Sequence, residues 1–286
     1  MKGNVNDKVA LITGSSSGIG LLTAVELASR AYRVIATMRN LERRGKLDEA
    51  AKAAQVSDRI DVRCLNIAET DSVATAIAVI VRDYGRIDVL VNNAGFAMAG
   101  FAEDIALTEL REQFETNFFG HVAVTKAVLP TMRALKSGHI IMVTSIAGRT
   151  AHPTLSSYSS SKFALEGWSE SLRIELRSVG IRVVLVEPGA YETDIWTRNA
   201  KIGQRAFDGS SPNAERGRRF RDYVQSGGIK KRDPREVSRL IARIAEDPNP
   251  KLRYLIGNDA WMQLCLKTLA PWRWYEKLVA KAVKID

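Results

Sequence analysis

The sequence predicts an α/β protein with a doubly wound parallel sheet of seven strands and helices on both faces. Short β-branched runs alternate along the chain with longer segments of helical periodicity, which is typical of βαβ units. A glycine-rich turn also joins the first such run to the first helical segment. We therefore expect parallel strands connected by helices that cover the sheet on both sides.

The elements follow one another in a regular order. The expected strands are 8–13, 33–37, 59–65, 87–93, 139–145, 181–187 and 252–257. The expected helices, which supply the crossovers, are 18–30, 70–85, 104–136, 156–179 and 234–246. No Pro/Gly/Ser-rich linker interrupts the 286 residues, so 1–286 is expected to form a single domain.

Two regions depart from this alternation. Segment 190–232 has weak periodicity, and ten of its residues are Lys or Arg, which predicts a mobile substrate loop. Segment 258–286 is a basic, aromatic C-terminal extension. The N-terminus shows no secretory signal, and no run of about 18 apolar residues occurs, so a cytoplasmic protein without a membrane span is expected.

The positive charge is concentrated near the C-terminus. Of the formal net charge of +10, residues 201–286 carry +9. This charge could favour an anionic substrate such as an acyl thioester carrier, a membrane, or only solubility. No nucleic-acid recognition motif is present, so nucleic acid is not an expected partner.

Cysteine and histidine give no sign of metal or redox chemistry. Cys64 and Cys265 are far apart in apolar segments and are expected to be buried structural thiols rather than a disulfide, as in a cytoplasmic protein. His121, His139 and His152 lack partners at metal-ligand spacing, so no metal site is expected. We assign none of these histidines a catalytic role, although His152 precedes the helix 156–179.

The glycine turn "TGSSSGIG" predicts a dinucleotide site of the Rossmann type. Gly14, Gly18 and Gly20 let the backbone approach a pyrophosphate, and the following helix offers free N–H groups and the positive end of its dipole. The intervening residues are expected to contact the cofactor as well: Ser16, Ser17 and Ile19.

The end of the second strand favours NADP(H) over NAD(H). An acidic residue at this point would bond a ribose 2′-hydroxyl, but the sequence has Met38 followed by Arg39. An acid would repel a 2′-phosphate, whereas the guanidinium of Arg39 can pair with it.

Six ordered motifs make the chain resemble the short-chain dehydrogenase/reductase (SDR) family. After the glycine turn come "VNNAG" (91–95), "ETNFFG" (115–120), "VTSIAG" (143–148), "YSSSK" (158–162) and "EPGAYET" (187–193). The likeness covers about residues 7–195. "VIATMRNL" and the long tail are most similar to the hydroxysteroid and retinol dehydrogenase branch.

The resemblance implies a catalytic set of four residues. Tyr158 would be the general acid/base, and Lys162 its electrostatic partner. Ser145 would hold the substrate oxygen, and the backbone of Asn117 would help to hold a water leading out from the lysine.

The resemblance also implies further cofactor contacts. Asn92, Ala94 and Gly95 would lie beside the adenosine ribose, together with Asn93. Asn66, followed by Ile67, stands where the family usually has an aspartate that bonds adenine; its amide oxygen can still accept that bond. Thr193, after Pro188 and Gly189, would contact the nicotinamide carboxamide.

The spacing of Tyr158 and Lys162 has a physical rationale. Residues four apart lie one turn apart on the same face of a helix. A phenol of ordinary pKa, about 10, is a weak proton donor at neutral pH. A neighbouring ammonium favours the phenolate, so we expect Lys162 to lower the pKa of Tyr158.

These features predict an NADP(H)-dependent oxidoreductase that interconverts a hydrophobic ketone or aldehyde and its alcohol. Substrate choice is expected in segments 96–103, 146–155 and 190–232, the first being largely apolar. Two alternatives remain: a 3-oxoacyl thioester reductase, and a non-catalytic NADP(H) sensor that docks on a membrane or partner.

The tail predicts an amphipathic helix after Pro271. Its apolar stripe consists of Trp272, Tyr275, Leu278, Val279 and Ala282, while Arg273, Lys277, Lys281 and Lys284 lie largely off it. The stripe could lie in a membrane interface, pack on the protein's own core, cover the substrate loop or form a subunit contact. Family resemblance implies a homodimer or homotetramer through helices 104–136 and 156–179.

Overall fold

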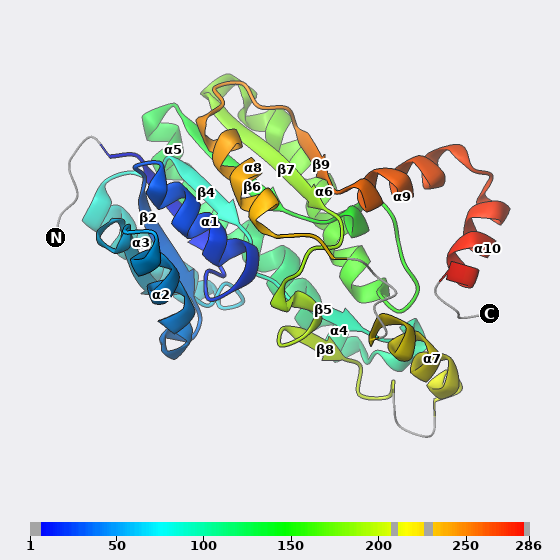
Figure 1. Cartoon of the computed structure of the whole chain (residues 1–286). Coiled ribbons are helices and arrows are strands. Elements are labelled where there is room, and N and C mark those ends of the chain that lie inside the picture. Colours follow the sequence, from blue (N-terminus) through cyan, green and yellow to red (C-terminus); the bar gives the residue numbers. More distant parts are fainter. Residues whose placement is uncertain (1–6, 207–210, 226–230, 283–286) are drawn as a thin grey trace.

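A seven-stranded parallel sheet forms the centre of the single domain, as predicted (Figure 1). The computed structural model describes residues 7–206, 211–225 and 231–282. The strand order is β3-β2-β1-β4-β6-β7-β9, and every pairing within this sheet is parallel. The direction of winding reverses between β1 and β4, and in such sheets ligands bind at the carboxyl ends of the strands at this point.

The observed strands agree with the predicted runs to within a few residues. They are β1 (Val9–Thr13), β2 (Arg33–Met38), β3 (Ile60–Cys64), β4 (Val89–Asn92), β6 (Gly138–Val143), β7 (Ile181–Pro188) and β9 (Arg253–Ile256). Two further short strands, β5 (Ala97–Ala99) and β8 (Ala200–Ile202), were not predicted and pair with each other. They attach the segment after β7 to the loop after β4.

The five predicted helices are present. They are α1 (Gly18–Ser29), α3 (Thr70–Tyr84), α4 (Leu107–Phe114) continuing into α5 (Gly120–Leu135), α6 (Ser156–Leu176) and α8 (Arg235–Glu246). The helix predicted after Pro271 is α10 (Trp272–Ala282). The structure adds α2 (Gly45–Ala53), α7 (Ala214–Gln225) and α9 (Asn258–Leu269). Thus α7 occupies part of the segment that was predicted to be an irregular loop.

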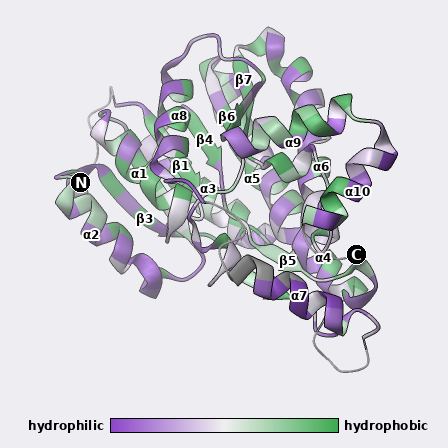
Figure 2. Ribbon diagram, turned by 45° about the vertical axis from the view of Figure 1, so that its right-hand side comes forward, coloured by the Kyte–Doolittle hydropathy of each residue, from purple (hydrophilic) through white to green (hydrophobic). Residues whose placement is uncertain are grey.

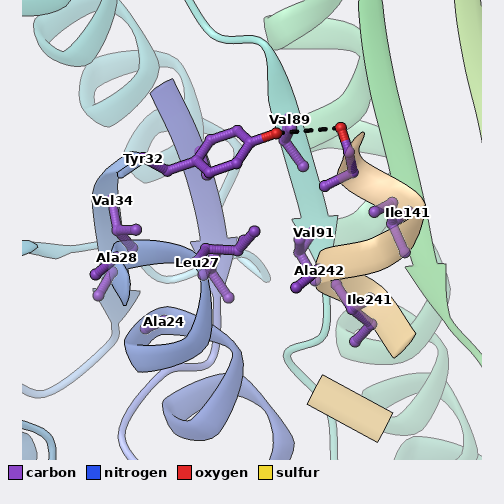
Figure 3. Packing of buried hydrophobic residues seen from close by; sticks show 14 of the residues in the cluster. Ala24, Leu27, Ala28, Tyr32, Val34, Val89, Val91, Ile141, Ile241 and Ala242 are labelled. Carbon is purple, nitrogen blue, oxygen red and sulfur yellow. Dashed lines mark hydrogen bonds between the residues drawn. The ribbon is translucent and has the colours of Figure 1, made fainter. Parts of the chain in front are cut away.

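Two apolar cores hold the helices against the sheet. Successive residues of β1 alternate between them: Ala10 and Ile12 face α1, α2 and α8, while Val9 and Leu11 face α3, α5 and α6. Figure 3 shows the first core, where the hydroxyl of Tyr32 also donates to the carbonyl of Ala245 at 3.1 Å. This scaffold fixes the carboxyl ends of the strands.

The prediction of buried cysteines was wrong. Cys64 and Cys265 are both free thiols, as expected, but both are exposed. Cys64 ends β3, the edge strand of the sheet, and Cys265 lies on the solvent face of α9. An apolar local sequence therefore did not establish burial. Among the described helices, none is long and apolar enough to cross a bilayer.

Candidate active site

The predicted site residues converge on one cavity of about 630 Å³ at the carboxyl edge of the sheet. The predicted residues that line it are Gly14, Ser16, Ser17, Gly18, Ile19, Arg39, Asn66, Ile67, Asn93, Ala94, Gly95, Ser145, Tyr158, Lys162, Pro188, Gly189 and Thr193. Gly20, Asn92 and Asn117 are buried and do not line the cavity, and Asn92 donates instead to Thr125 at 2.8 Å, so its expected contact with the ribose was wrong. The cavity therefore joins the glycine turn to the Tyr–Lys helix.

The glycine turn is packed too tightly for side chains. Gly14 and Gly18 have φ values of +72° and +56°, which strongly favour glycine. A Cβ on Gly14 would lie 2.7 Å from the Cα of Ala94. A Cβ on Gly20 would lie 2.3 Å from the carbonyl oxygen of Gly14 and 2.4 Å from Nδ2 of Asn93. The turn thus lies directly against the segment that follows β4.

The N-terminus of α1 faces the cavity with free donors. Its N-cap residue, Ser17, makes no side-chain capping hydrogen bond, and the first turn of the helix carries no acidic residue. Backbone N–H groups at such a terminus are unsatisfied within the helix and favour an anion. Together with the positive-φ glycines, they form a cradle suited to a pyrophosphate.

A basic rim follows this cradle. Arg39 and Arg43 line the cavity beside Asn40, and the side chain of Arg39 is exposed, whereas Met38 is buried. Nearby, the amide of Asn66 donates to Glu69 at 2.7 Å, and its oxygen accepts from the Ala68 N–H at 3.3 Å. The amide oxygen of Asn66 is therefore already engaged in the loop after β3.

Tyr158 and Lys162 lie on one buried face of α6, as their spacing predicts. Each side chain is about 3 % exposed, and Lys162 Nζ lies 5.7 Å from the centre of the Tyr158 ring. Lys162 also donates to the carbonyl of Val143 at 3.0 Å. Two residues after Val143, Ser145 accepts from the Ala147 N–H at 3.1 Å and hydrogen bonds to Tyr158. The three residues therefore form one cluster at the end of β6.

The expected lowering of the Tyr158 pKa is not observed. Burial raises the pKa of Tyr158 to about 12, and the hydrogen bond with Ser145 offsets only part of this effect. Burial also lowers the pKa of Lys162 to about 8, partly opposed by the charge of Glu166. The prediction considered the lysine but not desolvation, which the sequence alone does not reveal. At neutral pH the phenol is protonated.

Asn117 occupies an irregular turn between α4 and α5. Residues Glu115–Phe119 form a π-helical turn, a feature that is frequent at functional sites. The fully buried amide of Asn117 accepts from the Phe96 N–H at 3.2 Å and donates to the Phe96 carbonyl at 3.0 Å. Its side chain thus fixes the loop after β4, which leaves its backbone for the predicted contact with water.

The predicted substrate segments 96–103 and 190–232 line the outer end of the cavity through residues that were not singled out individually from the sequence. Trp196 lies edge-on to Tyr158, with ring centres 5.6 Å apart, and Ile195 packs on the same apolar cluster. Lys201 of β8 lies 5.2 Å from the Phe96 ring centre and pairs with Glu112. The Trp196–Tyr158 contact spans 38 positions, and the contacts of Lys201 with Phe96 and Glu112 span 105 and 89, so no local motif could have identified them.

The last motif connects the cavity to the C-terminal extension. A Cβ on Gly18 would lie 3.5 Å from Thr193, so Thr193 packs against the glycine turn. The carboxylate of Asp259, in the first turn of α9, accepts from the Ala190 N–H at 2.7 Å, and a Cβ on Gly189 would collide with it. The extension thus begins directly behind the cofactor end of the cavity.

The histidines lie outside this chemistry. His121 is fully buried, bonds the carbonyl of Ala94 at 2.6 Å, and has its pKa lowered to about 3, chiefly by burial. Burial also lowers the pKa values of His139 and His152. Within the described residues, no group of His, Cys, Asp or Glu could hold a metal ion.

The fold and the cavity define a nicotinamide-dinucleotide-dependent oxidoreductase of the Rossmann type. The family model for "short chain dehydrogenase" matches residues 8–202, and the chain belongs to this family. It is therefore an SDR enzyme that acts on CH–OH and C=O groups with NAD(P), as the sequence predicted.

Known relatives extend the likeness beyond the motifs. The chain is 44% identical over 278 residues to "Uncharacterized oxidoreductase YusZ" of Bacillus subtilis, covering 97% of this chain and 99% of the relative. It is 37% identical to human "Retinol dehydrogenase 8", covering 86% of this chain and 80% of the relative.

Two solved structures share the fold. A short-chain dehydrogenase from Streptomyces avermitilis superimposes with a TM-score of 0.82 at 33% identity, covering 96% of this chain and 98% of the other. A metagenomic short-chain oxidoreductase in complex with NADP gives 0.69 at 25% identity, covering 88% and 98%.

Proposed function

We propose that the protein is an NADP(H)-dependent reductase that converts a hydrophobic ketone or aldehyde to its alcohol, and the reverse. The observation that carries this proposal is the convergence of Ser145, Tyr158 and Lys162 in the cavity that begins at the glycine turn. A proton donor and a dinucleotide cradle in one cavity are what hydride transfer to a carbonyl requires.

The residues of the cradle fit a dinucleotide. Gly14 and Gly18 would admit the pyrophosphate, held by the free N–H groups of α1. Arg39 would pair with a 2′-phosphate, and the NADP complex of the metagenomic relative supports the same choice. We also assign cofactor contacts to Asn66, Ile67, Asn93, Ala94, Gly95, Pro188, Gly189 and Thr193. When bound, the nicotinamide supplies or accepts the hydride.

Residues of the chain stabilise and neutralise the negative charge that develops on the substrate oxygen. Ser145 donates a hydrogen bond to that oxygen, and Tyr158 delivers its phenolic proton there as negative charge develops. Lys162, buried beneath the ring, stabilises the resulting phenolate. The backbone at Asn117, in the π-helical turn, holds a water through which the proton is replaced.

The protonation state of the Tyr158 phenol at neutral pH suits the reduction of a carbonyl. With its pKa raised to about 12, Tyr158 carries a proton at neutral pH and is ready to donate it. Oxidation of an alcohol needs the phenolate instead. We therefore propose that Tyr158 acts as the proton donor when the carbonyl is reduced.

A hydrophobic substrate is supported by the outer end of the cavity. Tyr158 packs in an apolar cluster with Ala97, Ala147 and Trp196. Apolar walls around a few polar groups are typical of sites for small organic ligands. We assign the substrate loop to about 190–232, of which 207–210 and 226–230 lie outside the described residues. The likeness to a retinol dehydrogenase supports the same substrate class.

NADPH oxidation by the purified protein tests this proposal. The panel contains steroid ketones, retinal, aryl ketones and a 3-oxoacyl thioester, with NADH and Tyr158→Phe as controls. We expect turnover of an apolar ketone or aldehyde with NADPH and its loss in Tyr158→Phe without loss of NADPH binding. Turnover of carrier-bound ketones alone would favour the thioester reductase, and full activity of Tyr158→Phe would refute the mechanism.

We also propose that the C-terminal extension, 258–286, contacts anionic membrane surfaces. Its exposed apolar residues are Trp261, Met262, Leu269, Trp272, Trp274 and Leu278. Of the described residues of α10 only Tyr275 is buried, so the chain covers the stripe at Tyr275 but leaves Trp272 and Leu278 exposed. In Figure 2, α10 lies at the periphery of the fold, next to α9. Arg273, Lys277 and Lys281 supply the positive charge that anionic lipid attracts, while Lys284 lies outside the described residues.

Co-sedimentation with vesicles tests this contact. We expect the full chain to bind vesicles containing phosphatidylserine but not neutral ones, and a Trp272→Ser, Trp274→Ser variant to lose this binding. Leu41→Ser is the matched control, because Leu41 is an exposed apolar residue in the turn between β2 and α2, away from the extension and from the helices α5 and α6. Equal vesicle binding by the two variants would refute the proposal. A change in the oligomeric state of the Trp272→Ser, Trp274→Ser variant would instead indicate that the extension contacts a second copy of the chain.

Oligomerisation is proposed through α5 and α6. Phe119, Phe163 and Ile174 are exposed on or next to these helices, and Ile174 is 77% exposed. Large apolar side chains gathered on a surface favour a protein contact. A homodimer or homotetramer built through this surface would bury them.

A further inference from the structure

Behind Lys162 lies a buried acidic group that the proposed mechanism does not use. Tyr158, Lys162 and Glu166 are spaced four apart on α6 and so share one helical face. All three are buried, and Glu166 is only 4% exposed. A carboxyl group so far from water needs compensating partners, and such placement is uncommon unless they are present.

Glu166 is held rigidly in place. Its Oε2 accepts from Nη1 of Arg253, on β9, at 2.8 Å. A Cβ on Gly148 would lie 2.9 Å from Cγ of Glu166 and 3.2 Å from the carbonyl oxygen of Lys162. The backbone at Gly148 therefore packs directly on the turn of α6 between the lysine and the glutamate.

The charged surroundings are nearly balanced. Arg253 also contacts Glu187, on β7, at 3.4 Å and pairs with the exposed Glu170. Arg149 contacts Glu187 at 3.4 Å, and its carbonyl accepts from Lys267 of α9. On the opposite side, His121 of α5 is close enough for the charge of Lys162 to lower its pKa. Glu166 thus brings this network to within one helical turn of Lys162, near enough for its charge to act on the ammonium.

We propose that Glu166 is a positioning residue, which keeps Lys162 in its cationic form on the alkaline side of neutrality. The inference rests on the proposed function for its effect on turnover, because Lys162 must be an ammonium to stabilise the Tyr158 phenolate. The alternative is a purely structural ion pair between Glu166 and Arg253.

The direction of the effect follows from the two acid–base equilibria. Burial and the charge of Glu187 raise the pKa of Glu166 to about 8. Burial lowers the pKa of Lys162 to about the same value. As the pH rises, ionisation of Glu166 strengthens proton binding at Lys162, so the two groups titrate together. Removing the carboxylate therefore matters little at pH 7 and progressively more above pH 8.

NMR titration of Lys162 tests this inference without requiring turnover. Full-length protein is labelled with ¹⁵N and ¹³C in lysine, and Lys162→Arg assigns the signal. We expect Glu166→Gln to weaken proton binding at Lys162 by about tenfold, the lower end for an opposite charge nearby. Glu170→Gln is the matched control, because it removes a partner of Arg253 but leaves Glu166 intact.

An unchanged Lys162 titration in Glu166→Gln, or an equal change in Glu170→Gln, would overturn the inference. If Glu166→Gln does not fold, glutamate-labelled wild type gives the answer, with Glu166→Asp for assignment. The Glu166 carboxyl signal must then respond over the pH range in which Lys162 loses its proton; independent titrations would overturn the inference. In active enzyme, the rate ratio of wild type to Glu166→Gln should rise above pH 8.

Discussion

The substitution Gly20→Ala should reduce both stability and NADPH affinity. The new methyl group would lie 2.3 Å from the Gly14 carbonyl oxygen and 2.4 Å from Nδ2 of Asn93, so one of them must move. That amide ties β1 to β4, because it donates to the carbonyls of Thr13 and Gly14 at 3.0 and 3.1 Å. The substitution therefore disturbs the phosphate cradle and its support together.

The loss in the free energy of unfolding caused by Gly20→Ala combines two effects. Overpacking costs about 1–3 kcal/mol, and weakening of the two Asn93 hydrogen bonds adds about 0.5–1.5 kcal/mol each. A total of about 2–6 kcal/mol lowers the Tm by roughly 3–10 °C, because unfolding 286 residues costs about 0.6 kcal/mol per degree near the Tm. We also expect most of the stabilisation by added NADPH to be lost, because the displaced Gly14 carbonyl belongs to the cradle.

Thermal unfolding followed by circular dichroism, with and without NADPH, measures both quantities. Gly45→Ala is the control: Gly45 is exposed at the start of α2 with a helical φ of −49°, and a Cβ there would meet no neighbouring group of the described residues within 4 Å. There we expect a gain of about 0.5–1 kcal/mol, as for alanine replacing glycine in a helix. Wild-type Tm and NADPH affinity in Gly20→Ala would refute the packing argument.

Three further predictions concern the cofactor, the substrate and pH. Arg39→Ser should raise the KM for NADPH by about tenfold and leave that for NADH unchanged; an equal effect on both cofactors would exclude recognition of the 2′-phosphate. Trp196→Ala should raise the KM for bulky apolar ketones by about five- to tenfold, through the lost ring contact with Tyr158, but not that for small ketones. The pKa of His121 is lowered to about 3 in the folded state, so the unfolded chain binds more protons between pH 3 and 6.5. Stability should therefore fall as the pH drops through this range, and less steeply in His121→Asn, as urea unfolding at each pH would reveal.

The dinucleotide end of the site was predictable because its chemistry is local. Gly14, Gly18 and Gly20 belong to one turn, and Tyr158 and Lys162 to one helix, so spacing alone places them. The strand and helix assignments rest on the same short-range periodicity. The fold was therefore predicted from the sequence, together with 17 of the 37 residues that line the cavity.

The substrate end was not predictable in the same way. Trp196 reaches Tyr158 only because β8 pairs with β5, and this pairing involves three residues on each side with little strand character of their own. The pKa of Tyr158 and the exposure of Cys64 depend on what other segments cover, which no local pattern records. Properties set by long-range packing thus required the structure.

The order of strands explains why motifs spread over nearly two hundred residues make one site. The strands β1, β4, β6 and β7 are neighbours in the sheet, and each ends at the same edge. Gly14, Asn93, Ser145 and Gly189 each follow or lie close to one of these ends, so the parallel sheet brings them together. Contacts between neighbouring ends, such as the hydrogen bond from Asn93 to the Gly14 carbonyl, then hold them in place. The segments that we propose to choose the substrate lie beyond this edge, outside the seven-stranded sheet. Substrate preference can therefore vary with residues such as Trp196 while the positions of Ser145 and Tyr158 stay fixed.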